Sequence, residues 1–220
     1  MLRFSEEILL LALDEKSGRL HALPERALEF ALAGALLVEL SFLGRLEADA
    51  DAAQLTIKGS GPAGDVVLDE VLKIFSANET KLAISRALAR VALKADIFKE
   101  QLFADLVRKG ILNQQQQKFL WVLRERRYPV VDDREEREVC ARIREAILTP
   151  GAIPGPVDVV LIGLMDACDL GGVVFTPAEL ERSAGRIKQI AGQNCIVQGI
   201  SRAIREIQQS ILEVIAYSAM

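Results

Sequence analysis

The sequence predicts a mostly α fold: a single compact helical domain over residues 1–220, with a small β-containing unit near its N-terminus and one β-hairpin. Half of the 220 residues are hydrophobic but only 5% are aromatic, so the core must consist of Leu, Ile, Val and Ala. This composition favours helices over a β-sandwich. Apolar residues recur every three or four positions in several segments, as on one face of a helix. A length of 220 residues fits one hydrophobic core.

Two helices and a pair of short strands are expected first. Ser5 can cap a helix through Leu13, and residues 14–18 have the composition of a turn. Pro24 suits the first position of a long helix that ends at Gly44, because proline is favoured there. Residues 45–47 and 55–57 are typical of strands around a polar turn. The order of helix, strand, turn and strand resembles a winged-helix unit.

Three further helices are expected over residues 65 to about 75, 80 to 93 and 96 to 109. Asp65 is the predicted N-cap of the first, and Gly110 follows the last as a left-handed cap. Arg86, Arg90 and Lys94 are four residues apart, so they would lie on one face of the middle helix. That face could meet a polyanionic surface, and an ordinary solvated helix face is the alternative.

The segment 119–131 breaks the helical pattern and predicts a β-hairpin. Its first strand, residues 119–123, would alternate apolar side chains between two faces, and the following arginines would crowd the tip. Aromatic and aliphatic groups beside arginines suit the headgroup region of a membrane. Membrane contact, protein contact and packing on the domain's own core remain three alternatives. The residues concerned are Phe119, Leu120, Trp121, Val122, Arg124, Arg126 and Arg127.

The C-terminal third is expected to be helical throughout. Asp133 and Glu136 form a plausible capping box for a helix to about residue 148, and residues 150–156 form a bend. The nearly continuous apolar segment 157–170 predicts a helix buried on most sides. Thr176 and Glu179 form a second capping box with Pro177 between them. The last helix carries one apolar stripe, formed by Ile196, Ile200, Ile204, Ile207, Ile211 and Val214.

Scarce residue types argue against an enzyme, a metal site or a bound cofactor. The three cysteines, Cys140, Cys168 and Cys195, lie far apart and are expected to be reduced, buried thiols. His21 is the only histidine, so zinc and Ser-His chemistry lack partners. Residues 59–64 are glycine-rich but lack the lysine of a phosphate-binding loop. No catalytic, metal or cofactor residue is therefore assigned.

The chain also lacks the patterns of a membrane-spanning or secreted protein. No apolar run reaches the roughly 18 to 20 residues that a spanning helix needs. The N-terminus has acidic residues where a signal peptide is apolar, so a cytoplasmic location is expected. Nucleic acid is not an expected partner, because the net charge is −4 and the long helix after Pro24 offers Arg26 against three glutamates.

Six sequence blocks, taken in order, resemble the Golgi phosphoprotein 3 family, and the chain is similar to a minimal bacterial member. They are LRFSEEILLLAL at 2–13, GALLVEL at 34–40 with GRL at 44–46, PAGDVVLDEVL at 62–72, LVRKGIL at 106–112, the hairpin from Phe119, and LIGLMDACDL at 161–170 with RIKQ at 186–189. No block is diagnostic alone. Their common order spans nearly the whole chain.

The resemblance implies a non-enzymatic adaptor, peripheral on the cytosolic face of membranes, that binds phosphatidylinositol 4-phosphate. It also implies protein clients, and a hairpin that inserts into membranes or joins copies into a homo-oligomer. The family's headgroup tryptophan falls on Pro24, one arginine on Ala33, and a basic pair on Asp96 and Lys99.

Only Lys99 keeps the family's chemistry, so the headgroup pocket is largely not retained. Two lost arginines remove charge-assisted contacts worth roughly 1.5 to 3 kcal/mol each. Binding of an anionic lipid would then depend on four basic residues, Lys99, Arg86, Arg90 and Lys94. The alternatives are a protein-binding scaffold without lipid binding and a winged-helix nucleic-acid binder.

Overall fold

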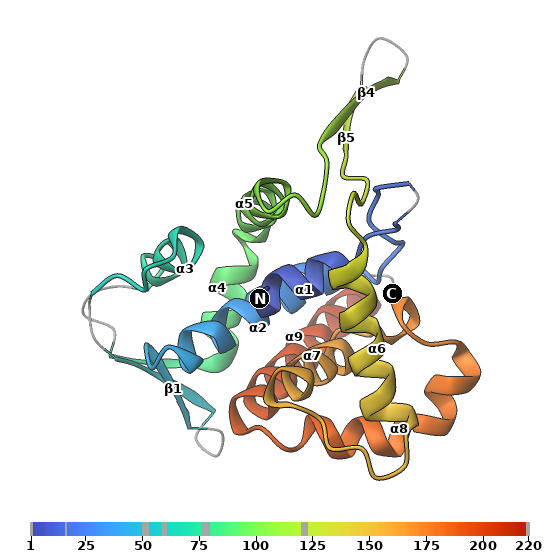
Figure 1. The fold of residues 1–220 in the computed structure, drawn as a ribbon. Helices are drawn as coiled ribbons and strands as arrows, with labels where there is room; N and C mark the ends of the chain where they lie inside the picture. Colours follow the sequence, from blue (N-terminus) through green and yellow to red (C-terminus); the bar gives the residue numbers. More distant parts are fainter. Residues whose placement is uncertain are drawn as a thin grey trace.

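Helices make up most of the structure, as the sequence predicts (Figure 1). The computed structural model describes residues 2–15, 17–49, 53–58, 61–75, 80–119 and 123–218. Within these ranges, the side chains of residues 116–119, 123–126 and 210–218 are not described. The mostly α fold class is confirmed, and two small antiparallel sheets accompany the helices in the described chain.

The first two helices begin at different residues from those predicted. Helix α1 (Phe4–Leu11) starts one residue before Ser5, with Arg3 as its N-cap. Ser5 lies inside the helix, and its backbone N–H donates to Glu39 Oε1 at 2.7 Å. Helix α2 (Ala27–Phe42) starts three residues after Pro24. Arg26 adopts a left-handed backbone with φ 61°, which turns the chain before the helix can begin.

The predicted strand pair is present and gains a third strand. β1 (Leu46–Asp49) and β2 (Gln54–Ile57) pair antiparallel, and β3 (Lys81–Ala83) pairs with the other edge of β2. A helix from Thr80 was the wrong prediction, since α4 (Ile84–Ala92) begins only after β3. Leu82 is buried between the exposed Lys81 and Ala83, which is the period of a strand. A three-residue alternation is too short to show in a helical pattern.

Helix α3 (Val66–Leu72) confirms its predicted cap. The Asp65 side chain accepts from the N–H groups of Val67 and Leu68, at 2.9 and 3.1 Å. Helix α5 (Ala95–Arg108) follows α4 after a two-residue corner. Gly110 has φ 76°, the left-handed conformation expected of a residue that ends a helix.

The β-hairpin exists, but its strands differ from the predicted ones. β4 (Gln115–Phe119) pairs antiparallel with β5 (Leu123–Arg127), and Phe119 pairs with Leu123. Arg124, Arg126 and Arg127 therefore lie along β5 and not at the tip. Leu120, Trp121 and Val122 fall outside the described residues. The paired strands stand away from the helices (Figure 1), and the strand boundaries predicted from the apolar pattern are wrong.

The C-terminal helices are α6 (Arg134–Leu148), α7 (Pro156–Ala167), α8 (Pro177–Ala191) and α9 (Cys195–Ser218), with a 3₁₀ turn η1 (Gly171–Val173) before α8. The capping box of α8 is confirmed: Thr176 Oγ1 accepts from the Glu179 N–H, and the Glu179 carboxylate accepts from the Thr176 N–H. The predicted box of α6 does not form. Asp133 occupies the N-cap, but its carboxylate makes no capping hydrogen bond and pairs with Arg137 at 2.5 Å, and Glu136 is buried.

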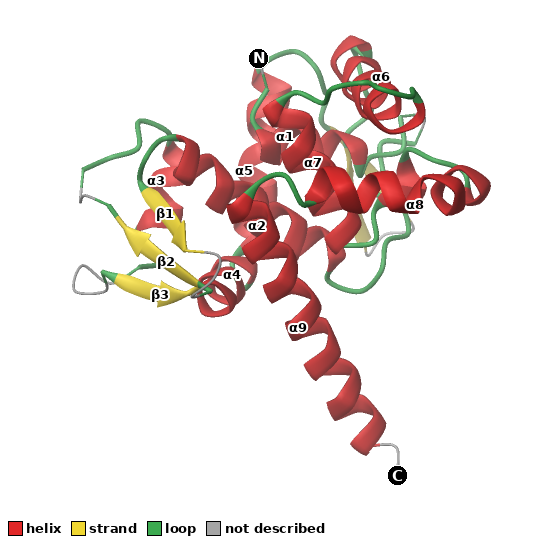
Figure 2. Cartoon of the chain, turned by 90° about the horizontal axis from the view of Figure 1, so that it is seen from below, coloured by secondary structure: helices red, strands yellow, loops and turns green. Residues whose placement is uncertain are grey.

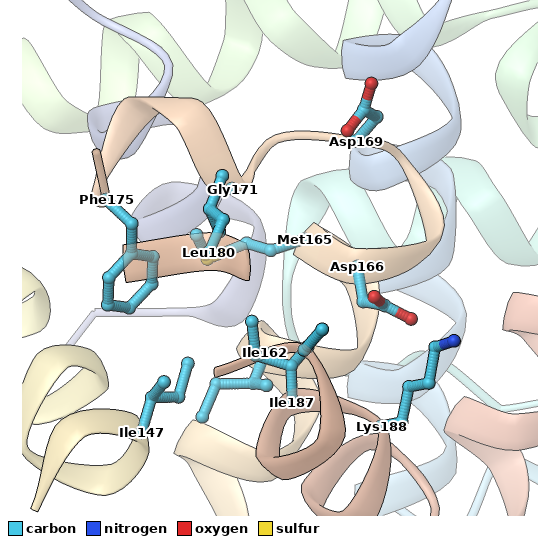
Figure 3. Close-up of a pocket in the computed structure, with 11 residues that line it drawn as sticks. Ile147, Ile162, Met165, Asp166, Asp169, Gly171, Phe175, Leu180, Ile187 and Lys188 are labelled. Atoms are coloured by element: carbon cyan, nitrogen blue, oxygen red, sulfur yellow. The ribbon is translucent and has the colours of Figure 1, made fainter. Parts of the chain in front are cut away.

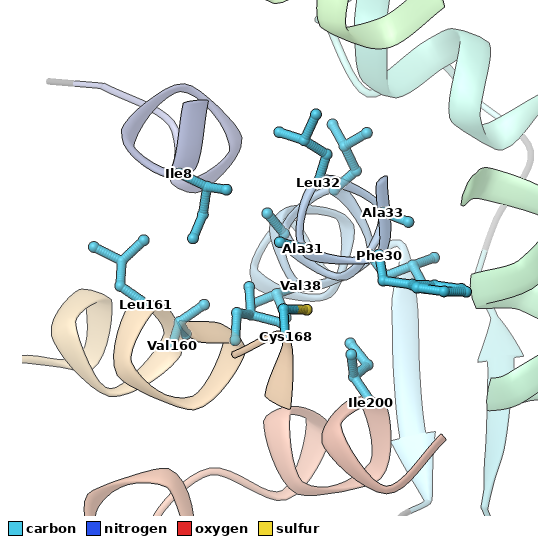
Figure 4. Packing of buried hydrophobic residues seen from close by; sticks show 14 of the residues in the cluster. Ile8, Phe30, Ala31, Leu32, Ala33, Val38, Val160, Leu161, Cys168 and Ile200 are labelled. Atoms are coloured by element: carbon cyan, nitrogen blue, oxygen red, sulfur yellow. The ribbon is translucent and has the colours of Figure 1, made fainter. Parts of the chain in front are cut away.

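The core gathers around α2, which contacts α1, α4, α7 and α9 (Figure 4). Phe30, Leu32 and Val38 are almost fully buried on different sides of this helix. Gly34 permits the close approach of α7, because a Cβ atom there would lie 2.6 Å from Leu164 Cδ2. Most of α2 is therefore inaccessible. This burial argues against the nucleic-acid alternative, which requires an exposed face on that helix.

Helix α7 is buried as predicted, and α9 packs beside it before extending away from the body (Figure 2). On α9, Ile196, Ile200 and Ile204 are buried and Ile207 is partly buried against the core. The side chains of Ile211 and Val214, the end of the predicted stripe, lie outside the described part. Among the described residues, no helix combines the length and apolar character needed to cross a membrane.

Candidate functional site

Two of the three predicted basic residues share an outward face of α4. Arg86 is exposed and Arg90 is half-buried. The opposite face of the helix is buried in the core through Ile84, Ala87, Leu88 and Val91. Because α4 ends at Ala92, the prediction that Lys94 continues this face is wrong. Lys94 instead lies exposed at the corner between α4 and α5, in the N-cap position of α5.

The same corner exposes two large aliphatic side chains. Leu93 is 78% exposed and Ile97 is 57% exposed, on either side of Lys94 in the sequence. Leu93 keeps a helical backbone, with φ −61° and ψ −22°, and follows Arg86 and Arg90 at a spacing of seven and three residues. It therefore extends their face. We call Arg86, Arg90, Leu93, Lys94 and Ile97 the basic corner.

The apolar part of the basic corner was missed in the sequence, although a signal was present. The buried stripe of α5 runs through Phe98, Leu102 and Leu106. Ile97 precedes the stripe by one residue, so it falls about 100° away from Phe98 around the helix. An isoleucine off the stripe and next to basic residues indicates an exposed apolar position.

Lys99, the fourth predicted basic residue, lies on α5 with its side chain 25% exposed and pairs with Asp96 at 2.6 Å. It lines a cavity of about 230 Å³ between the start of α2 and α5, which we call the α2–α5 cavity. Pro24 lines the same cavity, so two of the four positions that the resemblance assigns to a headgroup lie together. Ala33 is buried in the core instead, and Asp96 is exposed.

Charged groups of both signs line the α2–α5 cavity. Glu25 and Arg26 directly precede α2, Glu29 lies in its first turn, and Lys99 comes from α5. His21 lines the same cavity. No side chain caps the N-terminus of α2. The Arg26 guanidinium lies over the Phe30 ring, with its carbon 5.0 Å from the ring centroid. Sequence reasoning used Arg26 and the two glutamates only to argue against nucleic acid, because their common cavity depends on how α5 packs.

A larger cavity of about 420 Å³ adjoins the base of the hairpin, and we call it the hairpin-base cavity. Its aromatic wall is the stacked pair of Phe103 and Tyr128, with ring centroids 3.9 Å apart. The Tyr128 N–H donates to the Gly18 carbonyl at 2.8 Å, which fixes the end of the hairpin to the loop after α1. Leu20 and Lys99 line both this cavity and the α2–α5 cavity.

A third cavity, of about 210 Å³, lies among α6, α7 and α8 (Figure 3). Its interior is apolar, with Ile162 and Phe175 among the lining residues, and Asp166, Asp169 and Lys188 lie at its edge. None of the predicted site residues lines it. Its charged groups come from the end of α7 and from α8, which the sequence does not mark as neighbours.

Of the predicted hairpin residues, the structure describes the side chain of Arg127 alone. Arg127 is half-buried at the end of β5. The side chains of Phe119, Arg124 and Arg126 are among those not described, so only their positions along the ladder are known. Gln115 pairs with Arg127, at the end of the hairpin nearest the body.

A buried charged network holds the N-terminus of α1, away from these cavities. Arg3 pairs with Glu6 at 3.2 Å, with Asp65 at 2.6 Å and with Asp105, and Lys109 pairs with Glu6 at 2.6 Å. Burial alone would raise the pKa of Glu6, but hydrogen bonds from the Arg3 backbone and from Lys109 bring it below its usual value. Charged partners therefore keep Glu6 ionised although it is inaccessible.

Two other buried carboxyl groups have raised pKa values. Burial raises the pKa of Glu39 to about 7, despite the hydrogen bond from the Ser5 backbone. Burial, reinforced by Glu15 and Asp133, raises the pKa of Glu136 to about 7. Both groups cost free energy when they ionise in the folded protein.

The cysteines have no metal partners among the described residues, where no group of three His, Cys, Asp or Glu side chains could hold an ion. Burial raises the pKa of the Cys168 thiol, and it raises that of Cys140 to about 11, so both stay protonated at neutral pH. The expectation of buried thiols is correct for Cys168. It is wrong for Cys195, which is exposed at the start of α9.

Comparison with known proteins places most of the chain in one family. The sequence model of Golgi phosphoprotein 3 (GPP34) matches residues 4–207. The chain is also 24% identical over 165 residues to the vacuolar protein sorting-associated protein 74 of Eremothecium gossypii. That alignment covers 67% of this chain and 49% of the relative, so the chain spans about half the length of the curated relative that it matches.

Proposed function

Because the chain belongs to the Golgi phosphoprotein 3 family, we propose that it is a non-enzymatic peripheral membrane adaptor that meets an anionic lipid surface with its basic corner. The observation that carries this proposal is the exposure of Leu93 and Ile97 beside Arg86 and Lys94. Exposed aliphatic side chains flanked by cations suit the boundary between lipid headgroups and acyl chains.

The expected binding is weak and reversible. Each basic residue near an anionic surface contributes about 1 kcal/mol, and each aliphatic side chain contributes about 1.5–3 kcal/mol when fully buried. Part of this gain is offset by the loss of translational and rotational freedom. Salt weakens the electrostatic part, because charges are screened over about 10 Å at 0.1 M salt.

Co-sedimentation with phosphatidylcholine vesicles that contain phosphatidylglycerol tests the proposal. The protein is expected to pellet with these vesicles at low salt and to be released as salt rises. Leu93→Glu with Ile97→Glu is expected to lower the apparent affinity for the vesicles at least fivefold. A loss of about 1 kcal/mol of binding free energy corresponds to that factor. Ile153→Glu with Val131→Glu adds the same charge and is the matched control, because these side chains lie outside the basic corner and are 93% and 66% exposed. The proposal fails if the protein ignores anionic vesicles at low salt, or if the corner variant pellets like the control.

Self-association or client binding through the hairpin is a second candidate function. The β4–β5 ladder stands away from the helices (Figure 1), so most of its length lies apart from the described core. In this proposal Trp121→Glu changes the oligomeric mass in sedimentation, or vesicle pelleting, and leaves the circular dichroism spectrum unchanged. Loss of the helical spectrum would instead show that Trp121 supports the core.

A further inference from the structure

The cavity among α6, α7 and α8, which we call the α7–α8 cavity, has a buried apolar wall and a volume of about 210 Å³. The side chains that form this wall are at most 8% exposed, and they are Ile147, Ile162, Met165, Phe175 and Ile187 (Figure 3). Protein interiors leave few voids larger than a water molecule. Water gains little from an apolar wall, because it needs polar partners. A space of this size is therefore a site for an apolar group.

The volume and the wall of the cavity indicate the kind of apolar group. An apolar cavity of about 150 Å³ can hold a benzene molecule, so the α7–α8 cavity has room for one ring with a short chain. The Met165 thioether and the Phe175 ring line this space, and both groups make favourable contacts with aromatic rings. An aromatic body therefore suits this wall.

Two carboxylates lie at the edge of the cavity, at the C-terminal end of α7 (Figure 3). Asp166 lies in the last turn of the helix, and Asp169 directly follows its C-cap, Cys168. The C-terminal end of a helix carries a partial negative charge, so carboxylates are disfavoured there. The helix dipole therefore does not account for these two residues, and both add to the negative potential at the edge of the cavity.

The protein itself compensates these carboxylates only in part. Asp169 makes no ion pair or side-chain hydrogen bond within the described chain. Asp166 has Arg205 near it, at 4.0 Å. Lys188 also lines the cavity, but it lies in the last turn of α8, where the helix dipole favours a cation, so the local fold accounts for it. The charge that the local fold leaves unexplained at the edge of the cavity is therefore negative.

We infer that the α7–α8 cavity binds a small aromatic amine, with the ring against the apolar wall and the ammonium group at the edge, near Asp166 and Asp169. An ammonium group donates charge-assisted hydrogen bonds to carboxylates, and the C-terminal end of α7 favours its charge. A carboxylate at the same position of the ligand would be repelled. The inference is independent of the proposed membrane function, because neither aspartate belongs to the basic corner.

An NMR titration with 2-phenylethylamine and with its uncharged analogue 2-phenylethanol tests the inference. Saturable shifts of the backbone amides of Gly171 and Ala184, which line the cavity, locate the binding. The amine is expected to bind about fivefold more tightly than the alcohol, the factor that one exposed ion pair can contribute. Asp166→Asn with Asp169→Asn is expected to remove this difference and to leave the affinity for the alcohol unchanged.

Glu145→Gln with Glu181→Gln is the matched control, because it removes the same charge from exposed positions of α6 and α8 that do not line the cavity, and it should keep the difference. Ala184→Leu puts a larger side chain at the wall and is expected to weaken both compounds. Equal affinities of the two compounds, or a difference that survives the double aspartate substitution, would overturn the inference. Binding that Ala184→Leu leaves unchanged, or an absence of saturable shifts with either compound, would overturn it as well.

Discussion

Arg3 joins three helices at the N-terminus of α1. Its guanidinium contacts Glu6 on α1, Asp65 at the start of α3 and Asp105 on α5. Glu6 is fully buried, and Lys109 is its other cationic partner. A buried carboxylate that loses a cation is costly, because the remaining charge is neither hydrated nor fully compensated.

Replacing Arg3 by methionine is expected to lower the free energy of unfolding by roughly 2–4 kcal/mol, somewhat below the usual cost of breaking a buried pair because Lys109 remains. Chemical denaturation followed by circular dichroism measures this loss. Lys73→Met removes a cation from the solvent-exposed pair with Glu70 and should leave the denaturation midpoint unchanged. Equal effects of the two substitutions would show that the network around Arg3 contributes nothing beyond a surface pair.

Burial of Glu39 makes the stability of the protein depend on pH. Its pKa rises from 4.5 to about 7 on folding because it is buried. The folded state therefore holds the Glu39 proton more tightly than the unfolded state. Stability from this proton is complete below about pH 4.5 and is lost as the pH rises to about 7.

Glu39→Gln is expected to raise the melting temperature at pH 8, where the wild-type group is ionised, by roughly 2–8 °C. The difference from wild type should shrink at pH 5, because both side chains are then neutral. The Gln side chain can still accept the hydrogen bond from Ser5. Thermal unfolding at the two pH values measures the effect, with Glu181→Gln as the exposed control. The assignment is wrong if the melting difference is the same at pH 5 and pH 8.

The contact between α7 and α9 depends on Gly163, and Gly185 on α8 offers a contrasting glycine in open space. A Cβ atom on Gly163 would collide with Val197 of α9, whereas a Cβ atom on Gly185 of α8 would meet no atom within 4 Å. Both glycines lie inside helices, where alanine is intrinsically favoured by about 1 kcal/mol. At Gly163, packing against α9 opposes the helical preference for alanine. At Gly185, no neighbouring atom opposes that preference.

Gly163→Ala is expected to destabilise the protein by roughly 1–3 kcal/mol, since α9 must shift to admit the methyl group. Gly185→Ala is expected to stabilise it by roughly 0.5–1 kcal/mol. Denaturant midpoints of the two variants, compared with wild type, check both signs. A gain in stability from Gly163→Ala would contradict the close packing of α7 against α9.

Helix positions could be predicted from the sequence where a periodic apolar face meets a core, as for α7 and α9. The caps at Asp65 and Thr176 were predicted correctly, because they depend on residues within one turn. β3 and the strands of the hairpin were not. β3 owes its state to the edge of β2, a partner distant in sequence, and the hairpin stands away from the helices (Figure 1), where an apolar pattern is a poor guide to strand boundaries.

The family and the fold class could be predicted from the sequence of the whole chain, whereas the candidate site could be predicted only in part. The order of six blocks predicted the Golgi phosphoprotein 3 family, and the match over residues 4–207 confirms it. Arg86 and Arg90 could be placed on one face because helical spacing fixes them. The exposure of Leu93 and the gathering of Glu25 with Lys99 depend on the angle between α4 and α5 and on loop geometry, which local patterns do not encode.

The stability of the folded chain as a whole is expected to be greatest at about pH 5. As the pH rises from about 4.5 to about 7, stability falls, because Glu39 and Glu136 lose their protons in the unfolded state while the folded state, in which both pKa values are about 7, still holds them. Below about pH 4.5, protonation of Glu6 and Glu179 removes stability, because cationic partners hold their pKa values low. Urea midpoints of dilute protein at pH 3, 5 and 8 should therefore pass through a maximum. A steady rise from pH 3 to pH 8 would contradict the raised pKa values.

Lys99 has one ammonium group and lines two adjoining cavities. Anionic groups bound in the two cavities would draw on the same positive charge. Binding in one cavity would therefore lower the affinity of the other for an anion, and thermodynamic linkage would make this effect equal in both directions. The base of the hairpin and the start of α2 would thus be energetically coupled through a single side chain.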